Sequence, residues 1–168
     1  MGLFTPDNDT LRELYIVQLR KALNMEKQIV EALPTMIEKS SRQELANVFR
    51  THLEESKEQY SRLERILTET DGAVSDKKCP AASALISEGQ SDIADAGNAQ
   101  VRDVVLIAAG NQIEHHEIAV YGTLRTWALV LGEDKHAELL DKSLDEEKNA
   151  DKLLTKLSEQ INLAAPVA

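Results

Sequence analysis

Two carboxylates interrupt an otherwise apolar helical pattern between Ile113 and Leu124, in the sequence IEHHEIAVYGTL. Glu114 and Glu117 lie three residues apart, and the run from Val104 to Gly110 that precedes them is entirely uncharged. Burying an ionised carboxylate costs several kcal/mol unless the group is paired or binds a metal. The segment therefore predicts half of a metal site inside a helix bundle, and the other half has to come from elsewhere in the chain.

Composition favours a single helical domain. The chain has 168 residues, of which 42% are hydrophobic and only 4% aromatic, with 7 Gly and 4 Pro. Few turn-forming and aromatic residues favour helices over sheets, and the length suits one domain, 1–168. The formal net charge of −10 argues against nucleic acid and against an anionic membrane surface, since both attract basic proteins.

The number of cysteines and the first residues of the sequence indicate the cellular compartment to expect. A lone cysteine, Cys79, excludes an internal disulfide and fits a reducing environment. The segment Met1–Pro6 has no basic start followed by an apolar block, as a signal peptide would. No apolar run approaches the roughly 20 residues that span a bilayer. We therefore expect a cytoplasmic protein that has neither a membrane nor nucleic acid as a partner.

Capping signals and apolar spacing predict two long helices in the first half of the chain. Thr10 and Glu13 have the spacing of a capping box, which predicts the start of the first helix. Pro34 is expected to kink this helix or end it near Leu33, although the apolar pattern can resume through Ile37. Ser41 begins a second capping box and therefore a second helix. The short break between them predicts an antiparallel hairpin.

The helical pattern loosens between about 71 and 98, where glycines and Pro80 interrupt the sequence. A short helix is expected over Ala81–Ile93. A connection of this length is far longer than an ordinary turn needs. It is long enough to carry the chain from one end of a bundle back to the other, which is the crossover found in ferritin-like four-helix bundles.

Two further long helices are predicted after this crossover. The third, about Gln100–Leu131, is apolar nearly all round and is therefore expected to be buried, with Gly132 as its C-terminal stop. Asp134 is expected to cap the fourth helix, whose tail frays from about Asn162. The predicted fold is an all-α four-helix bundle with a long crossover between the second and third helices.

Each long helix carries at least one acidic residue on its predicted buried side. Carboxylates gathered in one core repel each other unless protons or cations neutralise them. Carboxylate-rich sites with one or two imidazoles suit iron or manganese, and di-iron bundles draw ligands from all four helices in this way. The candidate metal ligands are Glu26, Glu55 with His52 on the same face, Glu114 and Glu117, and Glu147 with Asp151.

Other interpretations stay open for several of these residues. Glu55 and Asp151 lie at the edge of their apolar stripes, where an outer salt bridge is the commoner role. At least one of Glu114 and Glu117 is expected to face inward, but an all-round apolar helix gives no phase for choosing between them. A single histidine such as His52 is more often a core residue than a ligand.

Three remaining features are interpreted as structural. Glu133 and His136 have the Glu-x-x-His spacing of di-iron bundles, but they lie at the very start of the fourth helix. We interpret them as helix-capping charge. Cys79 is interpreted as a loop or packing residue, and Tyr121 as a core or interface aromatic.

Several motifs, in order along nearly the whole chain, resemble the YciF/YciE-like bacterial stress-protein family of the ferritin-like superfamily. The motifs are Met25-Glu26-Lys27-Gln28, His52-Leu53-Glu54-Glu55, Lys78-Cys79, Val101-Arg102-Asp103, Glu114-His115-His116-Glu117-Ile118, Tyr121-Gly122-Thr123-Leu124, and Glu146-Glu147-Lys148 with Asp151. The resemblance implies a ferritin-like bundle that forms a homodimer. It also implies two bound metals, usually iron, at Glu26, Glu55, Glu114 or Glu117, and Glu147.

The sequence departs from the superfamily at two places. Neither Glu55 nor Glu147 is followed by histidine three residues later, where Glu58 and Ala150 stand. His52, with Asp151 as a second candidate, would have to supply the missing ligands.

Two functions therefore remain. One is a stress-response protein with a dinuclear iron or manganese centre that oxidises the metal or consumes peroxide or oxygen. The other is a non-enzymatic acidic helical module that binds or packs as an oligomer without firm metal. No catalytic acid or base stands out, and nothing in the sequence indicates a hollow iron-storage shell.

Overall fold

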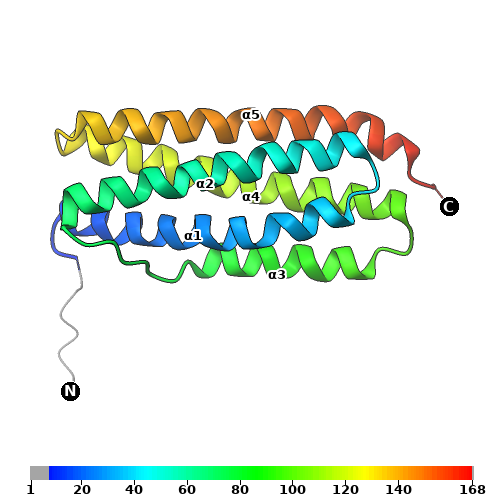
Figure 1. Ribbon diagram of the computed structural model, residues 1–168, viewed down its shortest axis with the longest axis horizontal. Coiled ribbons are helices and arrows are strands. Elements are labelled where there is room, and N and C mark those ends of the chain that lie inside the picture. Colours follow the sequence, from blue (N-terminus) through cyan, green and yellow to red (C-terminus); the bar gives the residue numbers. More distant parts are fainter. Residues whose placement is uncertain (1–7, 168) are drawn as a thin grey trace, which may run out of the picture.

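The computed structural model describes residues 8–167, which form five α-helices and no β-strand. Two antiparallel hairpins make up the bundle (Figure 1): α1 (Leu11–Lys39) with α2 (Gln43–Asp71), and α4 (Ala99–Val130) with α5 (Asp134–Ala164). The predicted four-helix bundle with a crossover is therefore confirmed. The expectation that Met1–Pro6 is no signal peptide lies outside the described residues.

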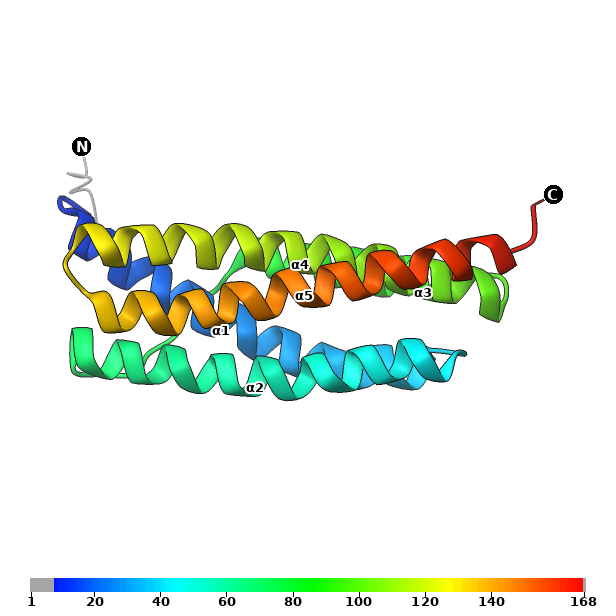
Figure 2. The same cartoon turned by 90° about the horizontal axis from the view of Figure 1, so that it is seen from above.

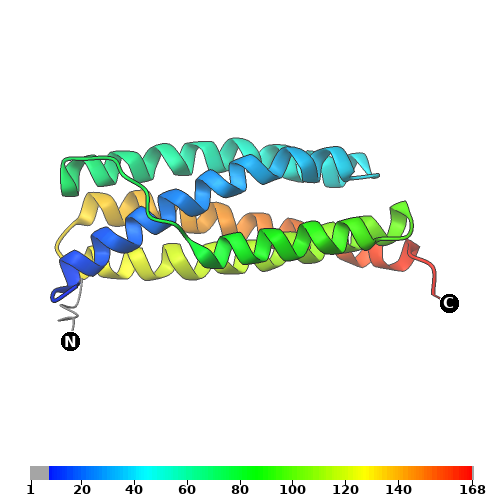
Figure 3. The ribbon, with the colours of Figure 1, turned by 90° about the horizontal axis from the view of Figure 1, so that it is seen from below.

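The two hairpins pack through α2 against α5 and through α1 against α4 (Figure 2). The crossover helix α3 (Pro80–Asp95) packs on α1 and α4. Figure 3 shows the connection from α2 passing over α1 before it enters α3. The amide of Lys77 donates to the Arg20 carbonyl and the amide of Cys79 to Asn24 Oδ1, which fixes this connection on α1.

The first helix starts as predicted but ends later. Thr10 accepts a hydrogen bond from the Glu13 amide at 3.2 Å, and Glu13 accepts one from the Thr10 amide at 2.8 Å. Of the outcomes expected at Pro34, an end of the helix near Leu33 is wrong, because α1 continues through Pro34 to Lys39. Pro34 is exposed, and the core contacts of the residues that follow it offset the lost backbone hydrogen bond.

The predicted capping box at the start of α2 does not form. Arg42 occupies the capping position, where its side chain makes no capping hydrogen bond. Ser41 instead donates to Asp103 of α4, from its amide at 2.8 Å and from its hydroxyl at 2.5 Å. Asp103 is 1% exposed, and a buried carboxylate needs such donors. Ser41 therefore joins the two hairpins rather than capping its own helix.

The ends of α5 also differ from expectation. Asp134 is the first residue of the helix rather than its cap, and Glu133 takes the capping position. Glu133 makes no capping hydrogen bond through its side chain, because its carboxylate pairs with Arg12 at 2.8 Å. The helix runs to Ala164, beyond the predicted fraying point at Asn162.

The third long helix, α4, is buried less completely than predicted. Asn98 caps it by accepting from the Val101 amide at 2.9 Å, and Gly132 follows it with a left-handed φ of 74°, as expected. The prediction that this helix is buried on all sides is wrong for a single chain, however. One face of α4 is exposed, and apart from His115 its exposed side chains are uncharged, including Ala108, Gln112, Ala119, Thr123 and Thr126.

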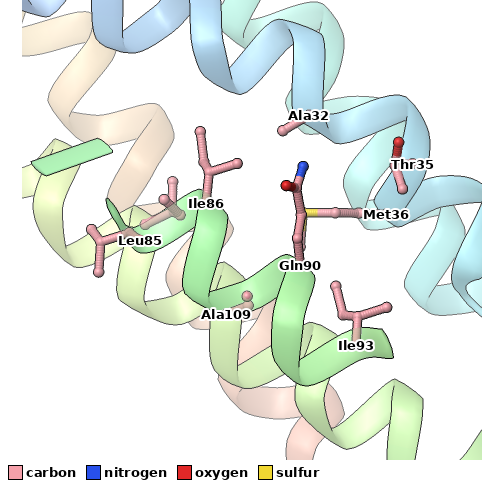
Figure 4. Close-up of a pocket in the computed structure, with 10 residues that line it drawn as sticks. Ala32, Thr35, Met36, Leu85, Ile86, Gln90, Ile93 and Ala109 are labelled. Atoms are coloured by element: carbon pink, nitrogen blue, oxygen red, sulfur yellow. The ribbon is translucent and has the colours of Figure 1, made fainter. Parts of the chain in front are cut away.

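A small apolar cavity of about 40 Å³ lies where α3 crosses α1 and α4 (Figure 4). Met36 of α1, Ile86 and Ile93 of α3, and Ala109 of α4 are among its lining residues, which include no acidic residue. Within residues 8–167, no helix is long and apolar enough to cross a membrane.

Candidate metal centre

Four buried side chains from α2, α4 and α5 meet in the interior of the bundle. His52, Glu114, Glu117 and Glu147 each place one ligand atom within 4.8 Å of the other three. His52 and Glu114 are each 2% exposed, and the other two are completely buried. We call these four residues the carboxylate cluster. His52 Nε2 lies 3.4 Å from a Glu114 oxygen, 3.7 Å from Glu117 and 3.9 Å from Glu147.

Helical spacing explains how α4 supplies two of these carboxylates. Glu114 and Glu117 are one turn apart and therefore share a face. Gly110 lies one turn earlier, where a Cβ atom would come within 2.8 Å of Leu154 on α5 and 3.4 Å of Phe49 on α2. The absence of a side chain at Gly110 lets α4 approach both helices closely, which brings both glutamates into the core.

Glu26 extends the cluster to α1. Its side chain is completely buried, and Oε1 accepts a hydrogen bond from the Tyr121 hydroxyl at 2.5 Å. The carboxyl group of Glu26 also contacts that of Glu117. Tyr121, which the sequence analysis treated as an ordinary core or interface aromatic, therefore lies in the core and holds a predicted ligand.

Glu55 and Asp151 lie outside the cluster. The inward face of α2 runs through His52, Ser56 and Gln59, all buried, which leaves Glu55 half-buried at the edge of the helix. Asp151 is partly exposed and lies 3.3 Å from His115 Nδ1 on α4. Both residues therefore have the position that is common for acidic residues at the edge of an apolar helix face, outside the core.

Gln59 is a residue of the site that sequence reasoning missed. It lies completely buried on α2, and its Nε2 donates to Oε1 of Glu147 and to Oε2 of Glu146. The available signal was an uncharged polar residue within the apolar stripe of α2, which needs a buried hydrogen-bond partner.

Burial sets the protonation of three carboxyl groups at the site, those of Glu26, Glu114 and Glu117. It raises the pKa of Glu26 to about 8, with repulsion from Glu147 as the next cause. Burial also raises the pKa of Glu114 and of Glu117 well above the ordinary value, and repulsion from neighbouring carboxylates adds to it. Without a cation, these groups therefore retain protons at neutral pH.

The imidazole of His52 is neutral in this environment. Burial lowers its pKa, and this effect outweighs the attraction of the nearby carboxylates. The three short contacts between His52 and the glutamates are therefore not ion pairs of an imidazolium. A neutral imidazole keeps one nitrogen lone pair, which is the form that binds metals.

The donor set fits a metal. Leaving a buried polar atom without a partner costs about 1–3 kcal/mol, and metal coordination would satisfy these atoms together. Among residues 8–167, the buried ligand atoms without a hydrogen-bond partner include both ring nitrogens of His52, both oxygens of Glu117, and one oxygen each of Glu26, Glu114 and Glu147.

Two residues interpreted as helix-capping charge, Glu133 and His136, lie apart from the cluster. His136 Nε2 is 3.1 Å from a Glu69 oxygen at the end of α2, and Glu133 pairs with Arg12. Cys79 is buried, with its sulfur 3.8 Å from His116 Nε2, consistent with the expected packing role.

Comparisons with known proteins identify relatives over most of the chain. Residues 10–165 match the model of a family described as Domain of unknown function (DUF892). Protein YciF of Escherichia coli (strain K12) is 38% identical over 150 residues, which cover 89% of this chain and 90% of that protein.

Two solved structures resemble the fold of this chain over nearly its whole length. The crystal structure of the E. coli stress protein YciF superposes with a TM-score of 0.89 at 35% identity, covering 94% of this chain and 100% of that one. YcfI from Rhodopseudomonas palustris, for which a structural role has been proposed, gives a TM-score of 0.88 at 35% identity over 91% of this chain and 98% of its own. These matches agree with the predicted helical bundle.

Proposed function

This chain belongs to the DUF892 family, and on that premise we propose that it is a YciF-like stress-response metalloprotein with a dinuclear iron or manganese centre. The carboxylate cluster and Glu26 would hold the two ions. One observation carries the proposal: buried ligand atoms from three helices converge within 4.8 Å, and most of them have no other partner within the described chain. The E. coli relative is itself described as a stress protein.

Charge supports two ions rather than one. Glu26, Glu114, Glu117 and Glu147 carry four negative charges when ionised, which two divalent cations would neutralise in the buried core. Arg62, whose positive charge acts on Glu26, is already paired with Glu146 at 2.6 Å. The carboxylates therefore need another source of positive charge if they are to ionise.

The bound metal would supply electron transfer to peroxide or oxygen, since carboxylate ligands stabilise the higher oxidation state. The residues of the chain have simpler tasks. His52 offers a neutral nitrogen, and Glu117 offers two oxygens that have no other partner among the residues that the structure describes. Tyr121 orients Glu26 through the hydroxyl group. The apolar bundle around them excludes water, which strengthens each electrostatic interaction in the site.

The proposed reaction can be tested by iron oxidation. Protein loaded with Fe²⁺ without oxygen is mixed with hydrogen peroxide or with air, and Fe³⁺ formation is followed by absorbance. We expect oxidation much faster than in buffer, and a loss of at least about 10-fold in Glu117→Gln. Asp145→Asn, an exposed acid on α5, serves as the control. Oxidation no faster than in buffer would contradict the redox function.

A second function, a non-enzymatic binding or packing module, is favoured by one specific observation. Glu58 and Ala150 stand where the superfamily has the histidines of its Glu-x-x-His pairs. The structural role proposed for the R. palustris relative points the same way. In this case Glu26, Glu114 and Glu117 would keep their protons, and the purified protein would bind iron and manganese no more tightly than its surface acids do.

We also propose that the chain pairs with a second copy of itself through the exposed face of α4. This face includes Ala108, Ala119 and Thr123, and Leu129 and Val130 at its end are 47% and 69% exposed. Apart from His115, which pairs with Asp151, the exposed side chains of this face are uncharged, so two copies can bury it symmetrically with little desolvation of charge.

A further inference from the structure

The two oxygens of Glu147 have different surroundings. Oε1 accepts a hydrogen bond from Nε2 of Gln59 on α2. Oε2 lies 3.9 Å from His52 Nε2, and it finds no hydrogen-bond partner in the part of the chain that the structure describes. One oxygen of this carboxylate is therefore held from outside the cluster, while the other lies on the side of His52. The Glu147 carboxyl also contacts that of Glu114, another residue of the cluster.

Gln59 is well placed to hold Glu147 in one orientation. It lies two helical turns after His52 on the same face of α2 and is completely buried. Its Nε2 carries two hydrogens, and it contacts two carboxylates: Oε1 of Glu147 and, at 3.1 Å, Oε2 of Glu146. A neutral amide supplies these bonds without adding charge to the cluster.

Glu146 is itself fixed by Arg62. The guanidinium donates from its two terminal nitrogens to the two Glu146 oxygens, at 2.6 and 2.8 Å, and it also donates to the Ser143 hydroxyl at 2.9 Å. Such a two-pronged pair is strong and directional. A continuous chain of hydrogen bonds therefore runs from Arg62 through Glu146 and Gln59 to Glu147.

We infer that Gln59 is a positioning residue that holds Glu147 by Oε1, so that Glu147 presents only Oε2 to a metal in the cluster. The inference rests on the proposed metal-binding function. Glu146 and Glu147 are neighbours in the sequence but have different tasks: Glu146 anchors the amide, and Glu147 binds the metal. Without Gln59, Glu147 is free to rotate and to bind through both oxygens.

The test uses Co²⁺ as the probe metal, because its visible absorption reports the coordination number. Gln59→Met keeps the length of the side chain but removes the donor. We expect it to bind Co²⁺ about 10–100 times more weakly than wild type, the usual effect of losing a partner of a metal ligand. Its Co²⁺ bands should also weaken, since a second Glu147 oxygen raises the coordination number.

Gln28→Met is the matched control. Gln28 bonds to Asn24, Cys79 and Ser83, where it ties the crossover to α1. Its loss should lower stability while leaving the Co²⁺ affinity and spectrum unchanged. If Gln59→Met does not fold, Gln59→Asn takes its place, because its shorter amide cannot reach Glu147 and the same weakening is expected.

The outcomes separate this inference from the function on which it rests. Wild type that binds Co²⁺, with Gln59→Met or Gln59→Asn showing the same affinity and spectrum, would overturn the role of Gln59 and leave the metal site standing. Wild type that binds neither Co²⁺ nor Mn²⁺ would overturn both. Weaker binding in the Gln59 variants alone, with a changed spectrum, would support the inference.

Discussion

Tyr121 and Tyr15 are both completely buried, yet their hydroxyl groups have opposite surroundings. The Tyr121 hydroxyl donates to Glu26 at 2.5 Å. The Tyr15 hydroxyl has no hydrogen-bond partner within residues 8–167. The two tyrosines therefore form a natural pair for measuring what the contact with Glu26 contributes, since the same atom is removed from the same kind of residue in both cases.

Tyr121→Phe should destabilise the metal-free protein by about 1–3 kcal/mol, because it leaves a buried Glu26 oxygen without a donor. Tyr15→Phe should be neutral or stabilising, because it removes a hydroxyl that is already unpaired. Urea unfolding of both variants at one pH measures the difference. Equal destabilisation by the two substitutions would show that the bond to Glu26 contributes nothing beyond packing.

The raised pKa of Glu26 predicts how the metal-free protein responds to pH. The folded pKa is about 8, above the ordinary 4.5 of the unfolded chain. The stability from this shift is therefore full below about pH 4.5, and it is lost as the pH rises toward 8. We expect the free energy of unfolding to fall between about pH 6 and pH 8, by up to about 1.4 kcal/mol per pH unit for each such carboxyl.

Chelator-treated protein unfolded in urea across this range measures the slope. Glu26→Gln cannot ionise at this position and should give a shallower slope. Burial also raises the pKa of Glu114 and Glu117, so some slope should remain in this variant. A free energy of unfolding that rises between about pH 6 and pH 8 would contradict the account of buried, protonated carboxyls.

At the scale of elements, the approach of α4 to its neighbours positions the site. Gly110 packs against Leu154 of α5 and Phe49 of α2, one turn before Glu114. A larger residue would push α4 outward and carry both of its glutamates away from His52. Gly110 is therefore needed for close packing. Gly97, which precedes α4, is different: it is exposed, and no atom of the described residues lies within 4 Å of the position that its Cβ would take.

Gly110→Ala should destabilise the protein by about 1–3 kcal/mol, because its Cβ would overlap the buried Leu154 side chain at 2.8 Å. Gly97→Ala should be stabilising by about 0.4–1 kcal/mol, because alanine restricts the unfolded chain at a position with open space. Thermal or urea unfolding distinguishes them. Stabilisation by Gly110→Ala would show that α4 is not held by close contact at this point.

Capping residues and apolar periodicity predicted most helix boundaries, because those signals are local to each helix. Contacts between helices were harder to predict from the sequence. The sequence could not show that Asp103 draws Ser41 away from its capping role, nor that both Glu114 and Glu117 face inward. An all-round apolar helix has no preferred face, so its rotation is set only by the packing around Gly110. The same limit hid the bond from Gln59 to Glu147.

At the scale of the whole molecule, the acids of the separate helices become one site only because the two hairpins face each other. Glu26 and the cluster residue His52 come from the first hairpin, and the other three residues of the carboxylate cluster come from the second. The crossover through α3 connects the two hairpins so that their inner faces meet. The motifs that indicated the family were spread along the chain for the same reason, since each helix contributes to the same interior.

The proposed dimer predicts a mass twice the 18.6 kDa of one chain. Ala119→Glu adds a charge to the exposed face of α4 and should give monomers, because a buried unpaired charge opposes association. Ser61→Glu, at an exposed position on α2, should leave the dimer intact. Sedimentation velocity measures all three proteins. Wild type that sediments as a monomer at micromolar concentration would contradict the pairing.

The most direct test of the metal centre is the amount of metal bound per chain. The protein is loaded with Fe²⁺ or Mn²⁺ in the absence of oxygen and is then desalted. The bound metal is measured by inductively coupled plasma mass spectrometry. We expect about two ions per chain in wild type and in Asp145→Ala, and a clear loss in Glu26→Ala and Glu147→Ala. Substoichiometric metal that neither cluster substitution changes would contradict the central claim.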